Sequence, residues 1–135
     1  TLLGLDVIND FGDTVTLTSG ISLQTLRTWK EFINKEEEEI IIKNNATELY
    51  FEENDIERFY EKLRNRNDIE YIHELKEHSW GQRVIRFYDM DKHIIEVGES
   101  LIKVIKRFLG RGLTKEETAI RMDVSIGFIE NSLNE

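Results

Sequence analysis

The sequence predicts an α+β fold with a mixed sheet built from a β-α-β-β-β unit at residues 47–99. Two further observations support this class. Residues 5–26 spell three short strands separated by tight turns, in the order of the last three strands of a similar unit. Residues 100–135 then read as a helical tail with no strand pattern. The repeat lies in the order of elements, not in residue identity.

In the first part of the chain the strands are expected at 5–10, 14–18 and 21–26, because β-branched runs alternate with turns containing Gly12 and Gly20. A short helix is expected at 28–35. The acidic run that follows, 35–39, is interpreted as a solvated charge run. The three isoleucines at 40–42 predict a buried strand.

The unit at 47–99 has the clearest periodicity. Its first strand, 47–52, alternates Leu49 and Phe51 with glutamates and a tyrosine. Asn54 and Glu57 form a capping pair for a helix whose apolar residues recur at i, i+3, i+4 and i+7. Three more strands are expected, at 69–75, 82–88 and 94–99.

The tail predicts three short helices. The first is stopped by Gly110 and Gly112, and the second opens with the capping box Thr114 and Glu117. The arrangement is similar to a helix-turn-helix. Its last helix, 126–135, has no Lys or Arg, so we expect a helical extension that packs on the domain or on a partner subunit.

Composition narrows the function classes. The 135 residues are 39% hydrophobic and 33% charged, carry a net charge of −9 and contain no cysteine. The 22 acidic and 12 basic side chains of residues 1–99 disfavour nucleic acid as a partner. Thiolate metal sites and cysteine nucleophiles are excluded. No apolar run approaches a membrane span, so we expect no membrane partner and a cytoplasmic protein.

Two carboxylates are candidates for chemistry. On the strand at 94–99, Ile95 and Val97 share the face under the helix, which turns Glu96 to the other face. The same alternation turns Glu48 away from Leu49 and Phe51. Two carboxylates on one face suit a hard or borderline divalent cation. A solvated strand residue remains the alternative for Glu48.

The stretch from Trp80 to Glu99 resembles the closing hairpin of the glyoxalase/bleomycin-resistance/dioxygenase, or vicinal-oxygen-chelate, superfamily, roughly W-G-x-R-x-x-x-F-x-D-P-D-G-[NH]-x-I-E-[LV]. The resemblance implies paired β-α-β-β-β modules that curl a mixed sheet around a cavity. Residues 1–46 would be a partial first module without its first strand, and 47–99 the second. It favours the interpretation that the sequence is a fragment of a longer protein.

The resemblance also implies a divalent metal ion held by Glu96, Glu48 and Gln24, with Glu96 or Glu48 moving a proton. Only Glu96 matches the family pattern. Glu48 stands where the family has His, and Gln24 stands where it usually has Glu. The same three side chains equally suit a metal-free pocket.

Other candidates would bind substrate. Arg83 and Arg86 lie on opposite faces of one strand, so only one of them shares the face of Glu96. A surface salt bridge is the alternative role for that arginine. Trp80 would line the same site, or else pack in the core. His93 and Lys92 are expected to form the turn before the last strand, with positive φ at Lys92.

The resemblance implies a glyoxalase-like protein, either a metal-dependent lyase or isomerase or a metal-free protein that binds or sequesters a small hydrophobic or cationic compound. We expect a small-molecule ligand and a homodimer, because modules of this superfamily bury their sheet edges by pairing. We also expect Glu96→Gln to leave the fold nearly intact, unless Glu96 pairs with an arginine.

Overall fold

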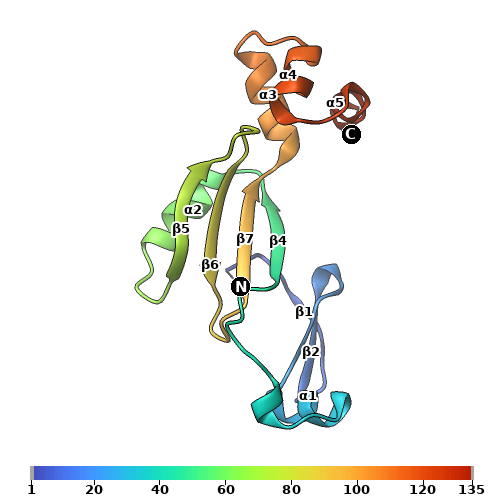
Figure 1. Ribbon diagram of the computed structural model, residues 1–135, viewed down its shortest axis with the longest axis vertical. Helices are drawn as coiled ribbons and strands as arrows, with labels where there is room; N and C mark the ends of the chain where they lie inside the picture. Colours follow the sequence, from blue (N-terminus) through green and yellow to red (C-terminus); the bar gives the residue numbers. More distant parts are fainter. Residues whose placement is uncertain (1, 135) are drawn as a thin grey trace. The chain divides into compact units, whose positions relative to one another are not determined.

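The structure, a computed structural model, describes residues 2–134 and divides the chain into two compact units between Ile41 and Ile42 (Figure 1). Among the helices of the described residues, none is long and apolar enough to cross a membrane.

The first unit holds a three-stranded antiparallel sheet. Its strands are β1 (Val7–Asp10), β2 (Thr14–Leu17) and β3 (Ser22–Gln24), joined in the order β1-β2-β3, with a 3₁₀ turn, η1 (Thr18–Gly20), between the last two. The predicted meander is therefore confirmed. Helix α1 (Leu26–Ile33) begins two residues before the predicted helix, because the Thr25 side chain accepts a hydrogen bond from the Thr28 amide and caps it.

The strand predicted at 40–42 is wrong. A 3₁₀ turn, η2 (Glu37–Glu39), is closed by a capping box between Glu36 and Glu39. Ile41 and Ile42 follow it without forming a strand, and they are 71% and 47% exposed. Three β-branched residues favour extended backbone, but they do not make a strand unless a neighbouring edge takes their hydrogen bonds. The acidic run before them is exposed, as predicted.

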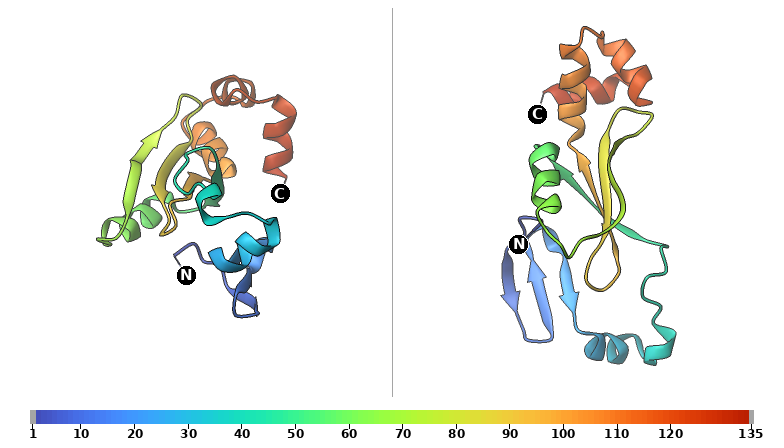
Figure 2. Two further views of the ribbon diagram at one scale, coloured as in Figure 1. Left: turned by 60° about the horizontal axis from the view of Figure 1, so that its bottom comes forward. Right: turned by 90° about the vertical axis from the view of Figure 1, so that its left-hand side faces the viewer.

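The second unit contains the predicted β-α-β-β-β order as β4 (Glu48–Glu53), α2 (Ile56–Arg64), β5 (Glu70–Glu77), β6 (Arg83–Tyr88) and β7 (Ile94–Glu99). The strand order is β4-β7-β6-β5, with β4 parallel to β7 and the other pairs antiparallel. The prediction that residues 47–52 and 94–99 share one mixed sheet is confirmed. Figure 2 shows α2 along one side of these strands.

Helix α2 covers one face of this sheet. Its buried side chains are Ile56, Phe59 and Leu63, and the buried strand residues are Ile85, Phe87, Ile95 and Val97. The helix begins one residue later than the capping pair predicted, because Asp55 and not Asn54 accepts the hydrogen bond from the Arg58 amide, at 3.1 Å. This packing is the reason that the alternate residues of β7 face away from α2.

The turn between β6 and β7 is held by Asp89. Its Oδ1 accepts hydrogen bonds from the amides of Asp91 and His93 at 2.9 and 2.8 Å, and Lys92 has φ +67°. The predicted turn with positive φ at Lys92 is confirmed. An L-residue at this φ is strained relative to the glycine usual there.

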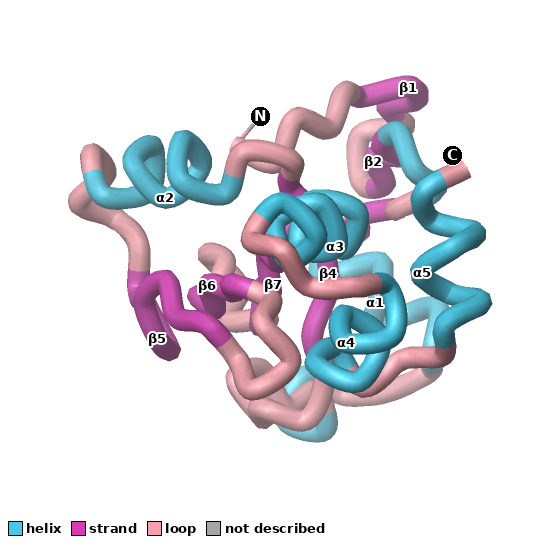
Figure 3. The backbone as a smooth tube through the Cα atoms, turned by 90° about the horizontal axis from the view of Figure 1, so that it is seen from above, coloured by secondary structure: helices cyan, strands magenta, loops and turns pink. Residues whose placement is uncertain are grey.

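The tail forms three helices, α3 (Leu101–Gly110), α4 (Lys115–Met122) and α5 (Ile126–Leu133), which Figure 1 shows beyond the end of β7 and Figure 3 shows from above. They enclose a core of their own, made of Val104, Ile105, Phe108, Ala119, Met122 and Ile129. The capping box predicted at Thr114 and Glu117 is present. Helix α3 follows β7 directly, so the tail is anchored to the strand that carries Glu96.

Candidate functional site

The strand register places the candidate side chains on the face of the four-stranded sheet opposite α2, called here the open face. Tyr50 on β4 lies opposite Glu96 on β7, and Glu96 lies opposite Arg86 on β6. Glu48 is two residues before Tyr50, so it shares the same face. The alternation expected from the sequence for Glu48 and Glu96 is thus confirmed.

The guanidinium of Arg86 joins both carboxylates and two imidazoles, and this group is called the Arg86 cluster. Arg86 Nε donates to Glu48 Oε2 at 3.0 Å, and one terminal nitrogen donates to Glu96 Oε2. The other terminal nitrogen lies 3.2 Å from Nε2 of His73 and 3.3 Å from Nε2 of His78. Nearly the whole donor capacity of the arginine is therefore used inside the protein.

The two carboxyl groups have opposite pKa shifts. The hydrogen bond from Arg86 lowers the pKa of Glu48. Burial, followed by the hydrogen bond with Glu48, raises the pKa of Glu96 in spite of the nearby guanidinium. Glu96 is only 6% exposed, whereas Glu48 is open to water. The hydrogen bond from Arg86 thus favours the ionised form of Glu48, whereas burial and the adjacent Glu48 favour the protonated form of Glu96.

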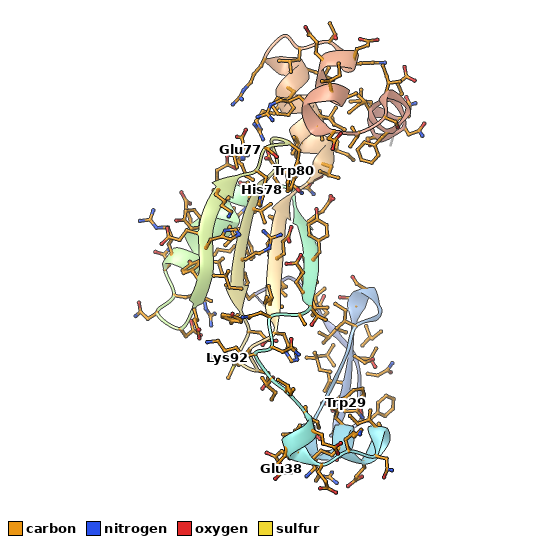
Figure 4. The ribbon with its side chains drawn as sticks, viewed as in Figure 1. Trp29, Glu38, Glu77, His78, Trp80 and Lys92 are labelled. Atoms are coloured by element: carbon orange, nitrogen blue, oxygen red, sulfur yellow. The ribbon has the colours of Figure 1, made fainter. Side chains whose placement is uncertain are left out.

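The two histidines act as acceptors. His73 Nδ1 lies 2.8 Å from the Glu74 carbonyl oxygen, so this nitrogen carries the hydrogen and leaves the Nε2 lone pair for Arg86. Burial, and then the positive charge of Arg86, lower the pKa of His78. The ring of His78 also stacks on Trp80, with centroids 4.4 Å apart and planes 5° from parallel. Figure 4 shows His78 and Trp80 together at one end of the sheet.

Gln82 connects the aromatic residues of this face. Its Nε2 donates to the Tyr50 hydroxyl and to the Glu99 carbonyl, each at 2.9 Å, and its Oε1 accepts from Trp80 Nε1 at 3.1 Å. A glycine is required beneath these contacts, because a Cβ on Gly98 would lie 2.7 Å from Gln82 Nε2 and 3.0 Å from the Tyr50 ring. Gly98 therefore makes room for the Tyr50–Gln82 contact.

Tyr50 is half-exposed at 46%, and its hydroxyl donates to Glu52 Oε1 at 3.1 Å. Burial of the hydroxyl end raises the pKa of Tyr50 to about 12. The phenol therefore stays protonated at neutral pH and serves as a hydrogen-bonding aromatic surface.

Arg83 lies on the other face. It donates to both oxygens of the buried Glu99, at 3.0 and 2.7 Å, and to Glu57 on α2. The prediction that only one of the two arginines shares the face of Glu96 is confirmed, and that arginine is Arg86. The guanidinium of Arg83 ties the sheet to α2, and its assignment as a substrate-binding residue stays a prediction.

The divalent ion that the family resemblance implies would need free oxygen or nitrogen donors on this face. Arg86 takes an oxygen of each carboxylate and the Nε2 atoms of both histidines, so a divalent ion would have to displace a guanidinium. Gln24 belongs to the first unit, and its amide donates to the Thr14 hydroxyl at 3.1 Å. Within residues 2–134 no three His, Cys, Asp or Glu side chains are grouped to hold a metal. As arranged, these donors do not fit a divalent ion, and the three-ligand assignment stays a prediction.

Two hollows in the described part of the chain are lined by residues that do not belong to the open face. One of about 530 Å³ runs along α1 and η2, and is lined mainly by charged side chains such as Arg27, Lys30 and Glu37. The other, of about 520 Å³, lies beside Ile120 and Arg121 on α4. Neither contains a group of side chains arranged for chemistry, so the open face remains the candidate site.

The family follows from comparison with known proteins. A family model described as a glyoxalase-like domain matches residues 1–102. The chain belongs to this glyoxalase-like family. A protein of unknown function from Agrobacterium tumefaciens str. C58 is 37% identical, with a TM-score of 0.61 over 73% of this chain and 76% of that one. No curated protein matches.

More distant structures agree in fold. A glyoxalase/bleomycin resistance protein/dioxygenase from Nocardioides is 18% identical, with a TM-score of 0.57 over 73% of this chain and 69% of that one. A glyoxalase-related enzyme from Fulvimarina pelagi is 13% identical, with a TM-score of 0.59 over 73% of each chain. The predicted superfamily and fold class are therefore confirmed for this glyoxalase-like chain.

Sequence reasoning did not assign three residues of the site, His73, Gln82 and Tyr50. His73 lies where the β5–β6 register shifts, between Tyr71 and Lys76, and such a bulge breaks the alternation from which faces are read. Gln82 occupies the variable position of the glyoxalase-like W-G-x-R motif, so nothing in the motif marks it. Tyr50, in contrast, could have been found from its alternation with Leu49 and Phe51.

Proposed function

We propose that this glyoxalase-like protein binds a small cationic aromatic molecule on the open face, without a metal ion. The observation that carries the proposal is the Arg86 cluster. One guanidinium already supplies the positive charge between Glu48 and Glu96, as a metal ion would, and its donors are spent on protein acceptors. The groups that remain to attract a ligand are therefore the carboxylates of this face.

The charge of this face is acidic around the cluster. Around the guanidinium of Arg86 this face carries three carboxyl side chains, those of Glu48, Glu52 and Glu96. Lys76, on the neighbouring strand, lies toward the end of the sheet near His78. The pKa of Glu96 is raised first by burial and then by its hydrogen bond with Glu48, and Arg86 offsets only part of this shift. A cationic group placed between Glu48 and Glu52 would relieve this excess.

Aromatic surface lies beside the carboxylates. Tyr50 is 46% exposed and Trp80 is 36% exposed, and both are held in place through Gln82. A cation over the face of an aromatic ring gains about 0.5–2 kcal/mol, depending on how far it is removed from water. Carboxylates next to fixed rings therefore favour a cation that is also flat and apolar.

Binding should be linked to proton release. Glu96 has a raised pKa in the free protein, so a bound cation that favours the carboxylate would lower that pKa. Affinity should then increase as pH rises through the pKa of free Glu96, and level off once Glu96 is ionised without ligand. An anionic ligand would show the opposite dependence.

A metal-dependent lyase or isomerase is the alternative that the family suggests. Glu96 and Glu48 would then hold a divalent ion, and a carboxylate would move the proton. Metal analysis of protein purified without chelators separates the two functions. One bound ion per chain would favour the enzyme, and a content far below one would favour the metal-free binding protein.

The binding proposal is tested with proflavine, a planar aromatic cation, and with anthracene-2-sulfonate as its anionic counterpart. We expect saturable proflavine binding by fluorescence, weakened by salt, and no comparable binding of the anion. Glu48→Gln should weaken proflavine binding about tenfold, equivalent to about 1.4 kcal/mol. Glu61→Gln removes an exposed carboxylate from α2 and should leave the affinity unchanged. Equal losses in both variants, or equal binding of the anion, would refute the proposal.

A further inference from the structure

The C-terminal helices contact the end of the four-stranded sheet, and among these contacts are those to residues 78–82, called here the Trp80 turn. Arg107 on α3 donates to the Gly81 carbonyl at 2.5 Å and to Glu99 Oε2 at 2.9 Å. Glu99 is 3% exposed and is also bound by Arg83. Arg107 is thus fixed by a buried carboxylate while it holds the turn.

Phe108, the next residue of α3, packs its ring onto the backbone of the same turn. A Cβ built on Gly81 would lie 2.2 Å from Phe108 Cζ, and Gly81 has φ +89°. The turn is closed by hydrogen bonds from the Gly81 amide to the His78 carbonyl and from the His78 amide to the Gln82 carbonyl, both 2.9 Å. Only glycine allows this turn and this approach together.

The residues on either side of Gly81 belong to the candidate site. His78 accepts a hydrogen bond from Arg86 and stacks on Trp80, and Gln82 donates to the Tyr50 hydroxyl. Figure 4 shows Glu77, His78 and Trp80 at the end of the sheet next to the C-terminal helices. A continuous chain of contacts therefore runs from α3 to Arg86 and to Tyr50.

We propose that the C-terminal helical extension is a positioning element for the open face, in which Arg107 and Phe108 hold the Trp80 turn so that His78, Trp80 and Gln82 reach the site. Loss of these two contacts releases the turn, separates His78 from Arg86 and breaks the stack on Trp80. A change in the packing of α3 therefore changes the ligand face without touching it.

This role is specific to the extension. The glyoxalase-like match ends at residue 102, so both positioning residues lie beyond it. The extension also holds the buried core of α3, α4 and α5, which gives α3 a rigid backing. Calling the face a ligand site rests on the proposed function, whereas the coupling of α3 to the turn does not.

The test uses the stack of His78 on Trp80. With Trp29 replaced by Phe, Trp80 is the only tryptophan of the chain. Protonation of His78 should then quench the fluorescence of Trp80. A protonated imidazole in contact with an excited indole ring accepts an electron from it, and the indole then returns to its ground state without emitting light. Burial and Arg86 hold the pKa of His78 below its ordinary value of 6.5, with Lys76 and His73 as the other nearby groups that lower it.

In this background we expect Arg107→Met and Phe108→Ala each to move the quenching midpoint up toward 6.5 and to reduce its amplitude. Lys106→Met removes an exposed charge from the same helix and should leave both unchanged. Phe108→Leu keeps apolar bulk in the core while removing the flat ring from Gly81, so it decides the matter if Phe108→Ala does not fold. A midpoint and amplitude like those of Lys106→Met, with only a lower melting temperature, would overturn the proposal. Because no ligand is added, this result is independent of proflavine binding.

Discussion

Replacing Arg86 by Met removes the cation on which the candidate site is built. Met keeps much of the apolar volume of the side chain but leaves Glu48 and Glu96 without a positive partner. Glu96, only 6% exposed, then has Glu48 as its near neighbour and no compensating charge. We expect the variant to be less stable, by an amount that depends on pH.

The size of this loss in the free energy of unfolding follows from the two ion pairs of Arg86, one with Glu96 and one with Glu48. The bond to Glu96 is charge-assisted and largely buried, and such bonds contribute about 1.5–3 kcal/mol. The pair with Glu48 has a carboxylate that is 40% exposed, so solvent screening reduces it to below about 1 kcal/mol. Protonation of Glu96 in the variant recovers part of the loss. A net loss of roughly 2–3 kcal/mol near pH 8 results.

The pH dependence has a definite sign. Without Arg86 the pKa of Glu96 in the folded variant is raised further above its value in the unfolded chain, which is about 4.3. The folded variant then holds a proton that the unfolded chain has lost. Its stability is therefore highest below that pH and falls as pH rises through the folded pKa. The loss relative to wild type should be smaller at pH 5 than at pH 8.

Urea denaturation followed by Trp80 fluorescence measures this loss, with Trp29 replaced by Phe so that only the second unit is reported. Lys76→Met, which removes an exposed cation from the adjacent strand, is the control and should change stability by less than about 0.5 kcal/mol. Glu96→Gln removes the buried counter-charge that Arg86 contacts, so it should also lower stability, by about 1–3 kcal/mol. Equal losses for Arg86→Met at pH 5 and pH 8, or a loss no larger than that of Lys76→Met, would refute the reasoning.

Three further outcomes are expected. Gly81→Ala should lower stability by roughly 2–5 kcal/mol, because it combines positive φ with a contact of 2.2 Å to Phe108, and a normal melting temperature would contradict this. Gly98→Ala should instead displace Tyr50 and Gln82, which a shift of the Tyr50 ring signals in NMR spectra would report and unchanged signals would disprove. The exposed edge strand β4, with Leu49 43% exposed, favours a homodimer, and a monomer mass in light scattering at micromolar concentration would exclude it.

The fold could be predicted largely because the second unit obeys simple periodicities. The alternation of Ile95 and Val97 with Glu96 and the helical spacing of Ile56, Phe59 and Leu63 match the buried faces that the structure shows. The strand predicted at the isoleucines 40–42 was wrong, because a strand needs a neighbouring strand edge to pair with, and local sequence does not reveal whether one is present.

The site could be predicted only in part. Alternation placed Glu48 and Glu96 on one face together with one of the two arginines, but it could not show which arginine, nor that it would bind both carboxylates instead of a ligand. The contact of His73 with Arg86 depends on a register shift between β5 and β6, and such a shift is a property of the two paired strands, which the sequence of one strand does not reveal. Gly81 was recognised only as part of the W-G-x-R motif, and its contact with Phe108 is set by the packing of the tail.

The central claim is that Arg86 replaces a metal ion at an acidic aromatic face that binds cations. It is tested most directly by measuring the proflavine affinity of the wild-type chain after exhaustive treatment with a chelator, and again with one equivalent of Mn²⁺ or Zn²⁺. We expect saturable binding that the chelator leaves unchanged and that neither metal strengthens. Loss of binding with the chelator, restored by a stoichiometric divalent ion, would contradict it and favour a metal site at Glu96 and Glu48.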